Sequence, residues 1–275
     1  MATPHSDPAL QQLVQHLRPA DASAGRFLSL PGLSGNSVKI TFPDRVWVAR
    51  SRPQPDLPFV DRQREYRILK KLARYGLIPR PLAANRQWLI VPWQPGEIYS
   101  PQRLSADYRQ VSAALWRLHR LPLTGYRISL SALLERYWQQ CQQRNYRGFR
   151  YWQRLRRHGE PRPLRLVPLH MDLHAGNLIY TEQGISVIDW EYAADGDIAL
   201  DLAALTLNDP EHQERWLEHY AQLSGIAPAR LRQQVRRWQP WLQLLAASWY
   251  QLRAEQSADP QLCALARDSW QTLTF

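Results

Sequence analysis

The chain has 275 residues, a formal net charge of +11 at pH 7, 44% hydrophobic residues and twelve tryptophans. This composition excludes a disordered chain, and the length suits one large domain or two lobes with a substantial core. We expect no membrane span and no signal peptide, because the sequence has no long apolar run and no basic region followed by an apolar one at its N-terminus. The two cysteines, Cys141 and Cys263, have no metal or redox spacing, which favours a reducing cytoplasm.

The first part of the chain predicts strands interrupted by two helices. Leu10, Val14 and Leu17 have helical spacing within the first twenty residues. Apolar runs predict strands at 26–30, 37–42, 46–50 and 87–91. A second helix is predicted from Asp61 to Tyr75. Gly76, which follows directly, is expected to end it.

After residues 92–97, which contain two prolines and a glycine, the sequence predicts mainly helices. These helices are predicted at 104–120, after a cap at Ser131, and at 199–207, 210–223, 228–255 and 260–272. Pro240 is expected to kink or divide the helix at 228–255. The change from strands to helices near Trp93 predicts an α+β protein with two lobes.

One segment between these helices carries most of the chemical information. His170-Met171-Asp172-Leu173-His174-Ala175-Gly176-Asn177 is followed by two short apolar runs and then by Asp189. The runs 178–180 and 185–188, separated by a turn, predict a β-hairpin that brings its two ends close together. We therefore expect Asp189 to lie beside Asp172 and Asn177.

Phosphoryl transfer requires few groups from a protein, and this segment contains a minimal set of them. A carboxylate must accept the proton of the attacking hydroxyl, and hard oxygen ligands must hold a metal on the phosphate. Asp172 suits the first role, and Asn177 and Asp189 suit the second. The alternative is a capped hairpin in which these residues only stabilise turns. That alternative does not explain the histidines on both sides of Asp172, nor the aspartate that follows the second predicted strand.

The motif His-x-Asp-Leu-His-x-Gly-Asn, followed by Ile-Asp-Trp, resembles the catalytic segment of the aminoglycoside phosphotransferase and choline kinase family. The resemblance implies a two-lobed protein-kinase-like fold: a small antiparallel-sheet lobe at 1–91, a hinge at 92–97 and a mainly helical lobe at 98–275. Residues 160–166 and 191–202 are similar to the members that phosphorylate thiamine. The resemblance thus implies ATP and Mg²⁺, with thiamine converted to thiamine monophosphate by a monomeric cytoplasmic enzyme.

The resemblance also assigns a nucleotide side. The loop before the second strand, with Ser34, Gly35, Asn36 and Ser37, is expected to cover phosphates. Glu65 lies on the apolar face of its helix and needs a cationic partner unless it reaches solvent. Family members carry a lysine at the strand position of Arg50, so Arg50 is expected to pair with Glu65 and to contact phosphate. The backbone around Trp93 could bind adenine, or its side chain could pack between the lobes.

The remaining candidates support the catalytic loop or the acceptor. The resemblance implies structural roles near Asp172 for His170, His174 and Asp201. A site for cationic thiamine should combine aromatic faces with carboxylates. The acceptor candidates are Trp190, Glu191, Asp195, Asp197, Trp238, Trp241, Trp249 and Tyr250. We expect at least half of the tryptophans among them to be core residues.

Two alternatives remain open from the sequence. Choline, ethanolamine or an aminoglycoside could be the acceptor in place of thiamine. The arginine-rich run from Arg144 to Arg165, which contains aromatic residues, could instead make the chain an RNA-binding module on an inactive kinase scaffold. We favour a solvated arginine face on an amphipathic helix, and so we expect no nucleic-acid partner.

Overall fold

The computed structural model describes residues 7–30, 37–76 and 78–273. The chain divides into two compact units, which are described in turn. The N-terminal unit consists of Met1–Leu104 with Ala175–Ala193, and the C-terminal unit of Ser105–His174 with Ala194–Phe275. Among the described residues, no helix combines the length and apolar character needed to cross a bilayer.

The N-terminal unit contains most of the strands. Its elements are α1 (Pro8–Leu17), η2 (Ala22–Ala24), β1 (Arg26–Leu30), β2 (Ser37–Thr41), β3 (Val46–Ser51), α2 (Arg62–Leu72), η3 (Ala73–Tyr75), β4 (Ala83–Ala84), β5 (Trp88–Pro92), β6 (Glu97–Ile98), η4 (Ala175–Asn177), β8 (Leu178–Thr181) and β9 (Gly184–Val187). The helix α3 (Pro101–Ala106) spans the boundary between the units. The predicted strands and both predicted helices are present, with shifts of a few residues at their ends.

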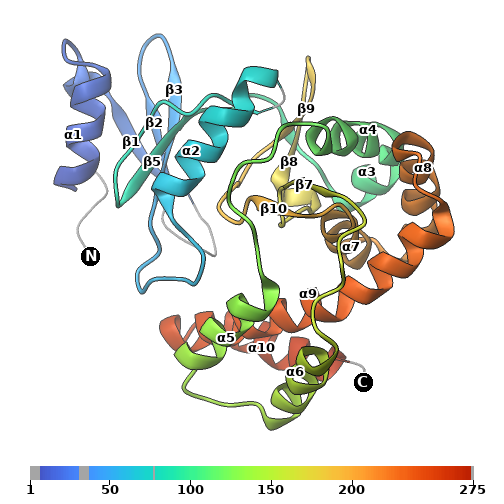
Figure 1. Cartoon of the computed structure of the whole chain (residues 1–275). Helices are drawn as coiled ribbons and strands as arrows, with labels where there is room; N and C mark the ends of the chain where they lie inside the picture. The colour runs from blue at the N-terminus through green and yellow to red at the C-terminus, as the bar shows by residue number, and fades with distance from the viewer. Residues whose placement is uncertain (1–6, 31–36, 77, 274–275) are drawn as a thin grey trace. The chain divides into compact units, whose positions relative to one another are not determined.

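A five-stranded antiparallel sheet forms the centre of this unit, in the order β1-β2-β3-β5-β4 (Figure 1). Side chains alternate between the two faces of a strand, so Ala49 and Arg50 on β3 point in opposite directions. Ala49 is buried in a core that Leu10 and Val14 of α1 complete. Arg50 faces the other side, where Glu65 of α2 contacts it. The alternation therefore separates an apolar face from a charged face.

A smaller sheet in the order β6-β8-β9 completes the unit. The hairpin predicted at 178–188 is present, and Leu178 pairs with Val187. Because Glu97 and Ile98 pair with β8, the segment Ala175–Ala193 belongs with the N-terminal unit by its contacts. The predicted hinge, 92–97, also lies within that unit, and the lobe boundaries drawn from the sequence stay a prediction.

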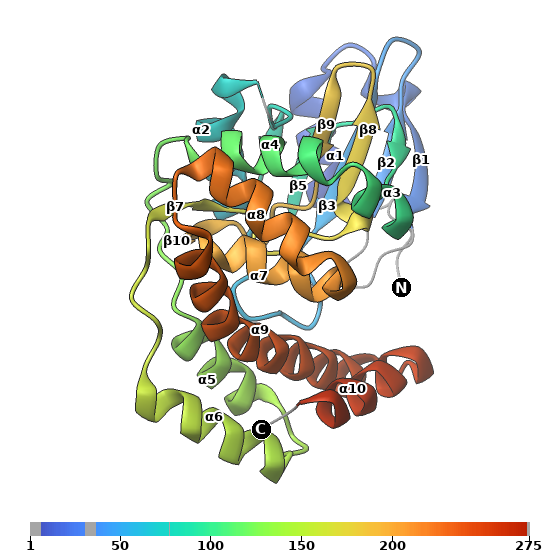
Figure 2. The same ribbon diagram turned by 90° about the vertical axis from the view of Figure 1, so that its right-hand side faces the viewer.

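The C-terminal unit is mainly helical. Its elements are α4 (Tyr108–His119), α5 (Leu130–Gln140), α6 (Tyr146–His158), β7 (Leu166–Leu169), β10 (Ala194–Asp197), α7 (Ala199–Asn208), η5 (Pro210–His212), α8 (Gln213–Ser224), α9 (Pro228–Ser257) and α10 (Pro260–Thr272). Figure 2 shows α10 lying along the C-terminal part of α9, and the two helices are in contact. The strands β7 and β10, which the sequence did not predict, pair antiparallel.

Two local predictions for the helices were wrong, and one of two alternatives for a third is excluded. The side chain of Ser129, not Ser131, caps α5 by accepting a hydrogen bond from the amide of Ala132. The predicted helix 104–120 is split between α3 and α4. Pro240 does not divide α9, whose 30 residues include it; the predicted kink stays a prediction. Buried Trp238 and Trp241 flank this proline, so tertiary packing offsets the backbone hydrogen bond that proline cannot make.

Candidate active site

The predicted catalytic loop begins where β7 ends, in the C-terminal unit. The buried carboxylate of Asp201, on the first turn of α7, accepts hydrogen bonds from the amides of His170 at 2.9 Å and Met171 at 2.7 Å. Met171 has a φ of 72°, a left-handed conformation that is uncommon for a residue with a side chain. Asp201 therefore holds the loop backbone in an unusual conformation directly before Asp172.

A second layer of buried groups holds Asp201 in turn. The ring of His119, on α4, contacts the carboxylate of Asp201 through Nε2 at 3.2 Å. The other ring nitrogen of His119 contacts the hydroxyl of Tyr220, on α8, in a short hydrogen bond. Burial raises the pKa of Tyr220, and the charge of Asp201 adds to this shift. The chain Tyr220–His119–Asp201 thus connects two helices to the loop.

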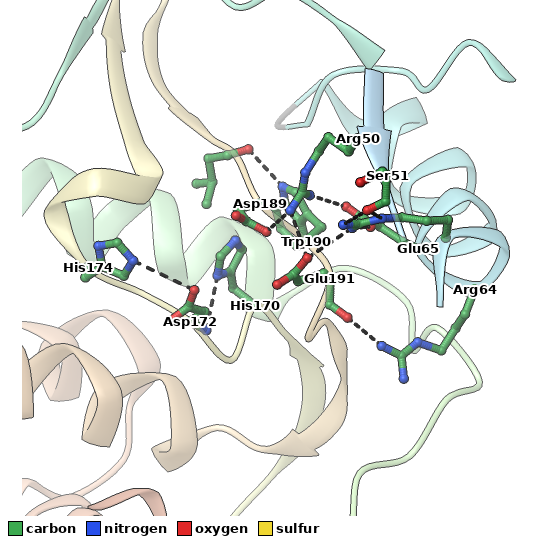
Figure 3. A network of polar contacts seen from close by, with 12 residues as sticks. Arg50, Ser51, Arg64, Glu65, His170, Asp172, His174, Asp189, Trp190 and Glu191 are labelled. Atoms are coloured by element: carbon green, nitrogen blue, oxygen red, sulfur yellow. Dashed lines mark hydrogen bonds and ion pairs between the residues drawn. The ribbon is translucent and has the colours of Figure 1, made fainter. Parts of the chain in front are cut away.

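The side chain of Asp172 is accessible, in contrast to these supports. The side chains of Asp172 and His174 are 42% and 40% exposed, with 3.8 Å between Asp172 Oδ2 and His174 Nε2 (Figure 3). The amide of Asp172 donates to Nδ1 of buried His170 at 3.3 Å. Asp172 thus presents an accessible carboxylate directly after two residues whose amides Asp201 binds, and a group that accepts a substrate proton must be accessible in this way.

In the N-terminal unit, Arg50 is the centre of a charged network (Figure 3). Its Nη1 donates to Oε1 of Glu65 at 2.6 Å, so the predicted contact between these two residues is present. Its Nη2 donates to Glu191 Oε2 at 3.0 Å and to Asp189 Oδ1 in a shorter contact. Glu65 is 1% exposed, so it does not reach solvent as the alternative interpretation required.

A second arginine, which the sequence analysis did not single out, completes this network. Arg62 is the first residue of α2, and its Nη1 donates to Glu65 Oε2 at 2.6 Å. The same nitrogen lies 3.1 Å from Oε2 of Glu191. The spacing of three residues between Arg62 and Glu65 on a predicted helix could have indicated their pairing. The involvement of Glu191 could not be read from the sequence.

The hairpin brings the two predicted metal ligands to the same end of the N-terminal unit. Asn177 lies in η4, directly before β8, and its carbonyl accepts a hydrogen bond from the amide of Ile188 at 3.0 Å. The next residue, Asp189, has a φ of 65°. Its side chain is 30% exposed, whereas Asn177 is buried. The predicted approach of residues 177 and 189 is therefore present in the backbone.

Glu191 and Trp190, two candidates for the acceptor site, are buried in the N-terminal unit. Glu191 is 2% exposed and is bound by Arg50 and Arg62, so its carboxylate belongs to the charged network. Burial raises the pKa of Glu191 to about 7, and the nearby Asp189 charge adds to this effect. Trp190 is buried, and its Nε1 donates to the carbonyl of Val187 at 2.8 Å, so it closes the hairpin.

Asp195 and Asp197, on β10, were the other acidic candidates for the acceptor site. Both are buried, and each accepts several internal hydrogen bonds. Asp195 accepts from the amides of Thr124 and Gly125, both at 2.7 Å. Asp197 accepts from the indole of Trp238 at 2.8 Å and from the side chain of Gln234 at 2.5 Å. These carboxylates stabilise the unit because their charges are satisfied by its own donors.

The aromatic candidates on α9 fall into two groups. Trp238 and Trp241 are buried core residues, as expected for part of this set. Trp249 and Tyr250 are only partly buried, and their rings contact each other edge to face with 5.1 Å between centroids. Burial raises the pKa of Tyr250, and the negative charge of Asp172 raises it further. Tyr250 therefore lies within electrostatic reach of the catalytic candidate.

The other nucleotide candidates are only partly described. Ser34, Gly35 and Asn36 lie outside the described residues. Ser37 begins β2 and pairs directly with Arg50 on β3. The amide of Trp93 donates to the carbonyl of Val46 at 2.9 Å, so it extends the sheet and is not available to adenine. The Trp93 ring is 37% exposed and lies beneath Lys39 Nζ, 4.2 Å from the ring centroid.

Sequence comparison relates the chain to known kinases. The phosphotransferase enzyme family matches residues 29–238 of the chain. A thiamine kinase from Escherichia coli O157:H7 is 44% identical over 246 residues, which cover 88% of each chain. A thiamine kinase from Shigella dysenteriae serotype 1 has the same identity and coverage.

Solved structures resemble the chain at lower sequence identity. The choline kinase LicA from Streptococcus pneumoniae has a TM-score of 0.76 at 17% identity, covering 98% of this chain and 99% of that one. An ethanolamine kinase from Plasmodium vivax also has a TM-score of 0.76, at 15% identity, covering 97% and 87%. The chain has the fold of these kinases, which confirms the predicted α+β class with a sheet in the N-terminal part and helices in the C-terminal part.

Proposed function

Because the chain belongs to the phosphotransferase enzyme family, we propose that it transfers the γ-phosphoryl group of ATP to the hydroxyl of thiamine. The products are thiamine monophosphate and ADP. The observation that carries this proposal is the 44% identity to thiamine kinases over 88% of both chains. The accessible Asp172 carboxylate and the partly exposed Asp189 agree with it, because both remain available for chemistry.

Asp172 is the group that orients the thiamine hydroxyl and accepts its proton. The side chain is accessible, and Asp201 fixes the backbone beside it through two amides. Phosphoryl transfer depends mainly on positioning and electrostatics, so a fixed backbone at this residue matters more than a basic side chain alone. His170 and His174 support the loop around Asp172, and neither is assigned a proton transfer.

Asn177 and Asp189 are the proposed ligands of Mg²⁺. Among the described residues, Oδ2 of Asp189 has no hydrogen-bond partner, whereas Oδ1 contacts Arg50. One carboxylate oxygen is therefore available to a cation. The described residues form no cluster of three or more His, Cys, Asp or Glu side chains that could hold a metal. Mg²⁺ usually takes one or two protein ligands together with water and substrate phosphate, and when bound it would neutralise phosphate charge.

Arg50, Glu65 and the loop 34–37 form the proposed phosphate side. Ser37 is the described residue of that range, and its strand pairing with Arg50 supports this assignment. Arg50 is charged at any working pH and presents several donors, so it can bind a phosphate oxygen while Glu65 orients it. It would do so in place of the lysine that the family carries at this position.

Trp249 and Tyr250 are the proposed aromatic contacts of the acceptor. Both are on α9, partly exposed, and Tyr250 is close enough to Asp172 for the two to interact electrostatically. Thiamine carries a permanent positive charge, and an aromatic face contributes about 0.5–2 kcal/mol to binding a cation. The negative charge of Asp172 attracts the same cation.

A panel of acceptors with labelled ATP tests the proposal. Thiamine, choline, ethanolamine and an aminoglycoside are each supplied at equal concentration, and transfer of the γ-phosphoryl group is measured with and without Mg²⁺. We expect kcat/KM to be highest for thiamine and Mg²⁺ to be required. Faster turnover of another alcohol would assign the chain to a different acceptor. Salt-sensitive RNA binding without any ATP turnover would contradict the proposed activity altogether.

A further inference from the structure

Arg62 is a buried cation that the proposed chemistry does not use. Its side chain is 1% exposed, and all three of its guanidinium nitrogens are engaged. Nε and Nη2 donate to the carbonyl of Ser51 at 2.9 and 2.7 Å, and Nη1 donates to Glu65. Because this guanidinium is enclosed, it is not accessible to a nucleotide. Arg62 instead joins the end of β3 to the start of α2.

Arg50 differs from Arg62 in two respects. Its side chain is 11% exposed, and it is the arginine of this pair that contacts Asp189. Both arginines contact Glu65 and Glu191. Glu65 and Glu191 therefore each have two cationic partners. Arg50 is partly accessible, whereas Arg62 is fully enclosed.

The charges of the network explain why two arginines are present. Asp189, Glu65 and Glu191 supply three carboxylates, against two guanidinium groups. A buried carboxylate left without a cation is strongly destabilised. If Arg50 alone neutralised Glu65 and Glu191, turning its Nη2 toward a phosphate would leave Glu191 unpaired. With Arg62 in place, each retains a partner.

We infer that Arg62 is a positioning residue that holds Glu65 and Glu191 and so allows Arg50 to bind the phosphates of the nucleotide. This inference rests on the proposed function, because it takes Arg50 as the phosphate contact. Without Arg62, Arg50 is the cation that must neutralise both buried carboxylates, and these contacts hold it away from the nucleotide. The effect falls on nucleotide binding and leaves the acceptor site unchanged.

The test measures nucleotide binding separately from turnover. The full chain and its Arg62→Met and Arg62→Lys variants are titrated with a fluorescent ATP analogue, and KM is then measured for ATP and for thiamine. We expect Arg62→Met to weaken analogue binding and to raise the KM for ATP by about tenfold or more, with the KM for thiamine within about twofold of the wild type. Arg62→Lys keeps the charge, so its nucleotide affinity should stay within about threefold.

A double variant separates positioning from folding. Arg62→Met is combined with Glu191→Gln, which removes the charge of one buried carboxylate. Arg50 then neutralises only Glu65 and Asp189. We expect the combination to recover at least about threefold of the lost nucleotide affinity. The matched control is Arg52→Met, which removes a neighbouring arginine whose partner, Asp56, is exposed. It should leave nucleotide binding unchanged.

Several outcomes would overturn the inference. These are equal losses for Arg62→Met and Arg62→Lys, parallel increases in the KM for ATP and for thiamine, or no recovery in the double variant. If Arg62→Met does not fold, as judged by urea unfolding, Arg62→Lys decides, and a tenfold loss in that folded variant contradicts the charge argument. A wild-type protein that binds no ATP analogue would refute the proposed function itself. Failure of the proposed function is therefore distinguishable from failure of the inference about Arg62.

Discussion

The substitution Asp201→Asn tests whether a buried carboxylate fixes the loop that carries Asp172. In the native protein this carboxylate accepts from two backbone amides and contacts the His119 ring. An asparagine side chain has one acceptor oxygen, so its amide nitrogen must face at least one of these donors. The substitution removes a charge-assisted hydrogen bond and leaves a buried N–H unpaired, a combined loss of about 3–5 kcal/mol.

The assay for Asp201→Asn combines urea unfolding with steady-state kinetics. We expect the free energy of unfolding to fall by about 3 kcal/mol or more, and kcat to fall by about 10²-fold in the fraction that remains folded. The kinetic loss follows because Asp172 is next to Met171, whose left-handed backbone depends on Asp201. A stable variant with native kcat would refute the argument that Asp201 positions the loop.

A matched control is Asp195→Asn in the same unit. This buried carboxylate also accepts two backbone amides, those of Thr124 and Gly125, but it does not contact the loop. We expect a similar loss of stability with kcat and the KM for thiamine unchanged in the folded protein. An increase in the KM for thiamine would instead restore Asp195 as an acceptor residue and contradict its structural role.

The remaining predictions concern single sites. Asp172→Ala should lower turnover by about 10²–10⁴-fold with the KM for ATP little changed, and wild-type turnover in that variant would remove this residue from the mechanism. Asp189→Asn should raise the Mg²⁺ concentration needed for half-maximal rate by about tenfold, which a metal titration measures. Tyr250→Ala should raise the KM for thiamine by about threefold or more while Tyr250→Phe stays near the wild type, because the aromatic face contributes the binding. Burial raises the pKa of the Cys141 thiol to about 12, so at pH 8 a thiol reagent should modify partly exposed Cys263 well before Cys141, and equal rates would contradict the packing around Cys141.

The sequence could predict the local features because each depends on residues close together in the chain. The hairpin at 178–187 follows from two apolar runs around a glycine-containing turn. The start of α2 follows from Asp61, whose side chain accepts from the amides of Gln63 and Arg64. The need of Glu65 for a cation also follows locally, because a carboxylate on the apolar face of a helix requires one. That this cation is Arg50 was implied by the family resemblance.

Tertiary structure decided which of the remaining polar residues are available to a ligand. Glu191, Asp195 and Asp197 have the composition of a cation-binding site, yet all are buried and satisfied by donors distant in sequence. Tyr250 reaches the neighbourhood of Asp172 from a helix 78 residues further along the chain. Whether a side chain meets solvent or an internal partner depends on how separate segments pack, and no local pattern of residues encodes that packing. The sequence alone thus indicated the phosphotransferase family through its catalytic motif, whereas the partners of each charge depended on the folded chain.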